Sequence, residues 1–399
     1  MTDASKQHSA SVRSGIARSD GAVYYKVAVQ TNQSKPAGTT MTKLRRLIVP
    51  AYLSGKTWQL AVATSLCLLA FNAHSQSAAS TDLPRTPDGR PDLQGLWTNQ
   101  TQTPLERPRE LGLQGALSAE EARAYEERAR QRVEMSNQPS DPNRPPPSDG
   151  NTDAGYNLFW LDRGTNVAVV NGEYRTSLIV NPPDGQIPFV EGDRPQGLIA
   201  QWRARPGVEP FDGPELRPLG ERCLLAFSSS SGPPMLPVMY NNNYQIVQTP
   251  DHVMILVEMV HDARVIPLNK SHSAHDTERW MGESVGRWEG DTLVVETRHF
   301  HPQQTFRGAS EHLVITERFW LENAGKIIYS VTLEDPTVFA QPWTAEIPMQ
   351  RRPAGEMMYE YACHEGNYAF SGILAGARKL EELGQQGPVD GALDGEESE

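Results

Sequence analysis

The stretch Leu313–Leu333, LVITERFWLENAGKIIYSVTL, decides the fold. Two runs rich in β-branched and aromatic residues lie on either side of Glu322–Gly325, a short segment of turn-forming residues. Runs of this length and composition form strands, and such a turn joins them into an antiparallel hairpin. The same pattern recurs along the chain, so the hairpin is the expected building unit.

Further strand-like runs lie on both sides of this hairpin, each ending at Gly, Asn, Asp or Pro residues that interrupt strands. We therefore expect a mainly β domain over residues 152–378, an antiparallel barrel or sandwich of hairpins. The additional runs are Thr176–Val180, Tyr244–Thr249, Val253–Val260, Gly286–Trp288, Thr292–Phe300, Trp343–Met349 and Met357–Cys363.

We expect an N-terminal arm over residues 76–151 ahead of the β domain, extended for most of its length and containing one helix. Ser118 and Glu121 form a capping box ahead of strong helix formers, which predicts a helix over residues 119–135. Its apolar stripe is narrow, so we expect a surface helix. The segment from Ser136 to residue 151 is rich in Pro, Ser, Asp and Asn and is predicted to be a linker or an ordered extended segment.

Residues 41–75 have the order of a cleavable signal peptide. A basic stretch after Met41 is followed by an apolar core, Trp58–Phe71, and by small residues before Gln76. The core is shorter than the roughly 20 residues of a spanning helix, which disfavours the alternative of a membrane anchor. We expect a periplasmic or secreted protein without membrane association after cleavage, and we interpret residues 1–40 as a doubtful upstream extension.

The net charge of the chain argues against nucleic acid as a partner. A formal net charge of −12 disfavours nucleic acid, whose phosphates need a basic surface. Part of this charge lies in residues 379–399, which are acidic, rich in Gly and nearly free of apolar residues. We expect this tail to be disordered.

Cysteine usage agrees with export. Cys67 lies in the predicted signal peptide, so only Cys223 and Cys363 remain in the mature chain. An even number of cysteines in an oxidising compartment predicts one disulfide between them. The alternative, a reactive thiol, has no local catalytic signature.

Two glutamates are the first candidates for chemistry. Alternation places Glu317 on an otherwise apolar strand face, and it places Glu258 on a strand with two apolar faces, with His261 next in line. A buried carboxylate must be paired or protonated, or it works as an acid, a base or a ligand anchor. Arginines that could hold these glutamates in a structural network are Arg264, Arg307 and Arg318.

Six histidines fall between His261 and His312. His299 and His301 would point to the same side if the strand predicted over Thr292–Phe300 continued to His301. This pair and the spacing His272-x-x-His275-Asp276 could each bind Zn or Fe, but neither pattern is specific. We expect these histidines to face solvent or to form hydrogen bonds, and we predict no metal and no cofactor.

Two further clusters could form sites. The loop Tyr240–Tyr244 contains three asparagines, so Asn241, Asn243 and Tyr244 could bind a polar ligand; the alternative is turn chemistry. His364 and Glu365, beside the predicted disulfide, could form a catalytic pair or cap a strand end. There is no Gly-x-Ser-x-Gly elbow, phosphate loop or dinucleotide fingerprint.

Five motifs together resemble a large family of exported, uncharacterised bacterial β-rich proteins. They are Pro91–Trp97, Arg175–Val180, Trp288–Val295, Val314–Phe319 and Tyr361–Asn367. The resemblance covers about residues 88–378 and implies export and a shared β-rich fold. It implies no activity for individual residues, and it implies a looser pattern at His299 and His301.

The preferred functional hypothesis is a protein that binds a small, partly apolar molecule, with Glu258 and Glu317 near the pocket. The ligand-binding candidates are Asn241, Asn243, Tyr244 and Arg264. The first alternative is an acid–base enzyme, a lyase or hydrolase, with Glu317, Glu258, His261 and His364 as catalytic candidates. The second alternative is a non-catalytic interaction protein of the cell envelope. The sequence names neither the ligand nor the oligomeric state.

Overall fold

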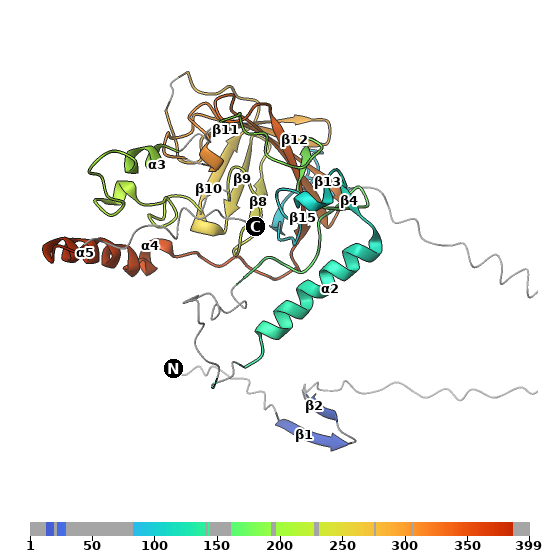
Figure 1. Ribbon diagram of the computed structural model, residues 1–399. Coiled ribbons are helices and arrows are strands. Elements are labelled where there is room, and N and C mark those ends of the chain that lie inside the picture. Colours follow the sequence, from blue (N-terminus) through green and yellow to red (C-terminus); the bar gives the residue numbers. More distant parts are fainter. Residues whose placement is uncertain are drawn as a thin grey trace, which may run out of the picture. The chain divides into compact units, whose positions relative to one another are not determined.

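A computed structural model describes residues 13–19, 22–28, 83–139, 143, 161–192, 197–226, 231–274, 277–304 and 306–385 (Figure 1). The chain divides into two units, residues 1–77 and 78–399. In the first unit, strands β1 (Arg13–Ser19) and β2 (Ala22–Ala28) form an antiparallel pair, where the sequence pattern predicts no element. The predicted signal peptide, residues 41–75, lies outside the described residues.

The second unit is dominated by one large antiparallel sheet that curls into a nearly closed barrel, so the predicted fold class is confirmed. Nine strands follow the order β10-β9-β8-β3-β15-β14-β13-β12-β11, and the short β7 (Ile179–Asn181) pairs with β15 beside this path. The nine are β3 (Gly95–Thr98), β8 (Asn243–Gln248), β9 (His252–Val257), β10 (Ala263–Pro267), β11 (Glu283–Glu289), β12 (Thr292–Arg298), β13 (Val314–Asn323), β14 (Lys326–Glu334) and β15 (Trp343–Arg351).

The barrel closes at a narrow seam between β10 and β11. Leu268 and Gly286 form a parallel bridge there, and Asn269 N donates a hydrogen bond to Gly286 O at 2.7 Å. A Cβ atom at position 286 would lie 2.8 Å from Leu268 Cδ2 and 3.0 Å from Ile266 Cγ2. Glycine at this position therefore lets the two ends of the sheet approach.

Strand alternation determines which side chains fill the barrel. In β13, Ile315, Glu317, Phe319 and Leu321 are buried, while the residues between them are only half-buried. Glu317 therefore lies on the apolar face that the alternation predicts.

A second, three-stranded sheet in the order β4-β6-β5 accompanies the barrel: β4 (Ala116–Leu117), β6 (Glu173–Arg175) and β5 (Val169–Val170). Helix α2 (Ala119–Ser136) follows β4 and begins at the predicted capping box. Glu121 N donates to Ser118 Oγ at 3.2 Å, and Ser118 N donates to Glu121 Oε2 at 2.7 Å. Only Ala122 and Ala129 of the helix are buried, as expected for a surface helix.

The C-terminal part of the unit differs from the prediction. No strand forms over Met357–Cys363; Met357 and Tyr359 are exposed, and α4 (Cys363–Gly366) begins at the disulfide cysteine. Such a strand would find no free edge on β15, because β14 lies on one side of β15 and both β3 and β7 lie on the other. Helix α5 (Tyr368–Glu382) then enters the segment predicted to be disordered, of which residues 386–399 lie outside the described residues.

Short helices complete the unit: α3 (Leu198–Arg203) and the 3-10 turns η2 (Arg109–Leu111), η5 (Pro214–Leu216), η7 (Met259–His261) and η8 (Phe306–Gly308). Cys223 and Cys363 form a disulfide that joins positions 140 residues apart, so the predicted pairing is confirmed. Within the described parts of the chain, every helix is too short or too polar to cross a bilayer.

Candidate functional site

A charged pair occupies the barrel interior. Arg264 on β10 donates two hydrogen bonds to Glu317 on β13, from Nη1 to Oε1 at 3.0 Å and from Nη2 to Oε2 at 2.5 Å. Tyr329 OH also donates to Glu317 Oε1 at 2.9 Å and in turn accepts the amide of Met235 at 3.0 Å. Of the three arginines that the sequence offers, the structure therefore selects Arg264 for Glu317.

The surroundings of this pair favour a structural role. Burial opposes the charge of Arg264, but the neighbouring Glu317 carboxylate keeps the pKa of Arg264 above its ordinary value. Burial, followed by the charge of Glu317, raises the pKa of the Tyr329 phenol. Glu317 has no exposed surface, and both of its oxygens accept hydrogen bonds, so a ligand cannot reach it unless the barrel opens.

Glu258 lies at one end of the barrel, in the turn after β9. The predicted strand to Val260 is wrong: β9 ends at Val257, where Glu258 takes helical backbone angles, and Val260 and His261 are left-handed, with φ of 64° and 51°. This turn leads the chain into β10, so His261 does not continue a strand face. Asn243 Nδ2 donates to Glu258 Oε2 at 2.7 Å, which gives this buried carboxylate an amide partner instead of the expected arginine.

The same end of the barrel brings together two predicted catalytic histidines around a carboxyl group that the sequence reasoning missed. Burial raises the pKa of Asp262, while nearby His261 and His364 act in the opposite direction. His261 Nδ1 lies 2.6 Å from the carbonyl oxygen of Tyr361, which ties the turn to the segment before the disulfide. Asp262 follows His261 directly, and this adjacency was the available signal.

A small cavity borders Asp262. Its volume is about 10 Å³, room for about one water molecule. Ser231 also lines it, and the buried Oγ of Ser231 has no hydrogen-bond partner among the described residues. The cavity is too small for an organic substrate.

The side chains of the asparagine loop Tyr240–Tyr244 mainly stabilise the turn itself. Asn241 adopts a left-handed backbone with φ of 58°, and Asn242 bonds through its side chain to both backbone groups of Val238. Tyr244 is fully buried; burial raises its pKa, and its hydroxyl accepts a hydrogen bond from Asn99 Nδ2 at 3.3 Å. These contacts match the turn alternative, and the ligand-binding role of the loop stays a prediction.

A much larger pocket, the α2 pocket, lies between helix α2 and the small sheet. Its volume is about 390 Å³, and neither Glu258 nor Glu317 lines it. The surface it presents is mostly apolar. It is lined by Gln102, Thr103, Pro104, Pro108, Glu110, Leu111, Leu117, Glu121, Ala124, Tyr125, Arg128, Val167, Arg175 and Thr176.

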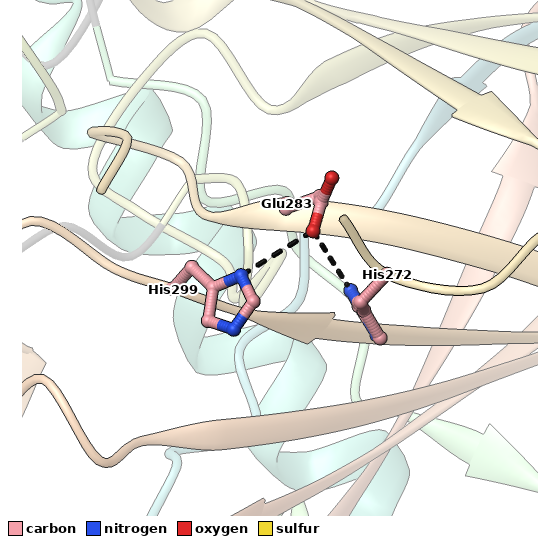
Figure 2. Close-up of side chains that lie close together, drawn as sticks. All are labelled: His272, Glu283 and His299. Carbon is pink, nitrogen blue, oxygen red and sulfur yellow. Dashed lines mark hydrogen bonds and ion pairs between the residues drawn. The ribbon is translucent and has the colours of Figure 1, made fainter. Parts of the chain in front are cut away.

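A cluster of two histidines and a glutamate lies at the end of the β11–β12 hairpin (Figure 2). β12 ends at Arg298, not at the predicted Phe300, because His299 adopts a left-handed backbone with φ of 57°. His299 therefore meets Glu283 and His272 instead of pairing with His301. His301 stacks on Trp280 with a centroid distance of 4.0 Å, and burial lowers its pKa. The predicted partners His275 and Asp276 lie outside the described residues.

Comparison with protein-family models, with curated proteins and with solved structures finds no match to this chain.

Proposed function

We propose that this protein is exported and binds a small, partly apolar molecule in the α2 pocket. The observation that carries the proposal is the volume of this pocket, about 390 Å³. Pockets for small molecules typically measure about 300–1,000 Å³ and combine apolar walls with a few polar groups. The cavity beside Asp262, at about 10 Å³, is far below this range.

The walls of the pocket indicate the chemistry of the ligand. Tyr125 supplies an aromatic surface, with the Arg128 guanidinium 5.6 Å from its ring centroid. Arg175 pairs with Glu173 and Glu346, and its buried Nε belongs to the wall and is not open to the pocket. Arg128 is the exposed cation of the lining, so a ligand with an apolar body and one anionic group, such as a carboxylate or sulfonate, would pair with it.

Export is supported by three observations. Residues 41–75 carry the signal pattern, and the Cys223–Cys363 disulfide is of a kind that persists in oxidising compartments. The five motifs that resemble exported bacterial proteins point the same way. N-terminal sequencing of the protein from a bacterial periplasm is expected to begin near Gln76, and a chain that retains residues 41–75 would contradict cleavage.

Filling the α2 pocket is expected to abolish ligand binding. Ala124 lines the pocket from α2, so Ala124→Trp places an indole in the space of the ligand. We expect the parent to bind the anionic probe anilinonaphthalene sulfonate saturably, and the variant to bind it at least about tenfold more weakly, a loss of about 1.4 kcal/mol. Fluorescence titration measures both affinities.

The matched control is Gln131→Trp, which adds the same indole to an exposed position of α2 outside the pocket lining. It should leave probe affinity unchanged. The neutral probe N-phenylnaphthylamine should bind more weakly than the sulfonate, because it lacks the anionic group that pairs with Arg128. Equal probe binding by Ala124→Trp and Gln131→Trp would remove the α2 pocket as the site.

A second candidate, an acid–base enzyme of the lyase or hydrolase class, has its own observation. Asp262 carries a raised pKa beside His261 and His364, and the backbone at Val260 and His261 is strained. Perturbed carboxyl groups and strained turns concentrate at active sites. In this candidate Asp262 is the proton donor or acceptor, and the cavity beside it holds the water.

The raised pKa of Asp262 predicts a pH effect on stability. The folded state binds the Asp262 proton more tightly than the unfolded state, so this group stabilises the fold below the unfolded pKa near 4 and loses that contribution as pH rises through the folded pKa. Asp262→Asn is expected to gain stability relative to the parent as pH rises from about 4 to 7.

Urea unfolding of both proteins across this pH range measures the difference. His364→Gln is the control, because it removes a side chain that lowers the pKa of Asp262 and should therefore raise that pKa further and widen the effect. A stability difference that does not change with pH would show that Asp262 titrates normally.

A further inference from the structure

We propose that His272, Glu283 and His299 bind a divalent transition-metal ion, and that Zn²⁺ is the ion this ligand set fits best. The site is separate from the proposed ligand-binding function, since none of the three residues lines the α2 pocket. It also differs from the sequence expectation, which pairs each histidine with a near neighbour along the chain.

Two of the distances among the candidate ligand atoms match those of a coordination sphere. His272 Nδ1 and His299 Nδ1 each lie 3.3 Å from the same atom, Glu283 Oε2. One ligand atom from each of the three residues lies within 4.8 Å of the others. Zn–N and Zn–O bonds of about 2.0–2.2 Å place neighbouring ligands of a tetrahedral ion about 3.3–3.5 Å apart. Figure 2 shows both imidazoles turned toward this carboxylate.

Hydrogen bonding alone accounts poorly for this convergence. Glu283 Oε2 already accepts the backbone N–H of Ser273 at 3.0 Å. His272 Nδ1 lies at hydrogen-bond distance from the same oxygen, so its roughly two lone-pair positions are taken, yet His299 Nδ1 also approaches it to 3.3 Å without hydrogen-bond geometry. A cation bound between the two Nδ1 atoms and Oε2 removes this conflict, because both imidazoles then act as neutral ligands.

The surroundings of His272 resemble those of a metal ligand. Its second ring nitrogen, Nε2, lies 3.3 Å from Glu296 Oε1, an ion-pair contact that lacks hydrogen-bond geometry. A carboxylate behind the distal nitrogen orients metal-bound histidines and increases their basicity. Arg298 Nε lies 2.8 Å from the same Glu296 oxygen, which holds that carboxylate in place.

Strand register places the cluster on the outer face of the barrel. Glu283 is opposite Arg298 and Ser284 is opposite Thr297 in the β11–β12 pair. Ser284 accepts a hydrogen bond from Arg264 Nη2 inside the barrel, so Glu283 faces outward. The three side chains are 15–24% exposed, which leaves a coordination position open to water or to a substrate oxygen.

Metal loading of the full-length chain tests the site. After incubation with excess Zn²⁺ and desalting, elemental analysis is expected to find about one ion per chain. Co²⁺ should give the visible absorption of a site with nitrogen and oxygen ligands. His272→Ala and His299→Ala should each weaken Zn²⁺ binding at least about a hundredfold, and Glu296→Gln about 10- to 100-fold.

The matched control is His252→Ala, because His252 is an exposed histidine whose Nδ1 lies 3.1 Å from Asp251 Oδ1. It should bind Zn²⁺ as the parent does. Zn²⁺ should raise the melting temperature of the parent and the control but not that of His299→Ala, which separates lost binding from lost folding. Less than about a tenth of an ion per parent chain, or unchanged affinity in both His272→Ala and His299→Ala, would overturn the proposal.

Discussion

Glu317→Leu is expected to lower the free energy of unfolding by about 3–5 kcal/mol, because it leaves the Arg264 guanidinium buried without a counter-charge. The substitution also removes the acceptor of the Tyr329 hydroxyl. Urea unfolding of parent and variant at pH 7 measures the loss. A difference below about 1 kcal/mol would mean that water or local opening already solvates the pair.

The double variant Arg264→Met with Glu317→Leu distinguishes the cost of an unpaired buried charge from the cost of changed packing. Replacing a whole buried ion pair with apolar residues is often neutral or even stabilising, so the double variant should recover most of the loss. Arg318→Met is the control on the same strand, because Arg318 forms a surface pair with Glu289 and should change stability by no more than about 1 kcal/mol. Equal losses in the single and double variants would contradict this account.

Removal of the disulfide is expected to have an effect of similar size. The Cys223–Cys363 bond closes a loop of 140 residues, which the chain-entropy model values on the order of 4–5 kcal/mol. The double variant Cys223→Ser with Cys363→Ser should therefore unfold at a much lower urea concentration. The parent treated with dithiothreitol is the matched comparison and should show the same loss.

Removal of the disulfide should destabilise the segment around Cys363 more than the barrel. Asn367 Nδ2 donates to Glu221 O at 2.7 Å, so one contact near the disulfide survives its removal. Hydrogen exchange should nevertheless show faster opening of α4 and α5 in the serine variant. A stability change below about 1 kcal/mol would mean that the unfolded chain is already restricted without the bond.

Much of the barrel could be predicted from local pattern. The β13–β14 hairpin follows from a period of two and a short turn, and burial of Glu317 follows from the same alternation. The endings of β9 and β12 could not be predicted in this way, because each depends on a non-glycine residue in a left-handed conformation, Val260 or His299. Tertiary contacts impose such conformations, and composition does not reveal them.

The candidate sites were less predictable than the strands. The choice of Arg264 for Glu317 depends on strand order, which brings β10 and β13 to the same barrel interior. The cluster of His272, Glu283 and His299 joins three segments, so spacing along the chain suggested the wrong partners. The α2 pocket was missed because a narrow apolar stripe on a helix says little about the wall opposite it.

The position of β3 in the sheet determines when the barrel can close during translation. This strand, near the start of the described part of the second unit, lies between β8 and β15, and Trp97 is opposite both Tyr244 and Arg351. A chain that emerges from the ribosome N-terminus first therefore holds β3 without its second partner until almost the whole barrel has been made. The barrel of such a chain therefore cannot close before β15 has been synthesised, so ribosome-bound chains should expose β3 to any partner that binds free strands.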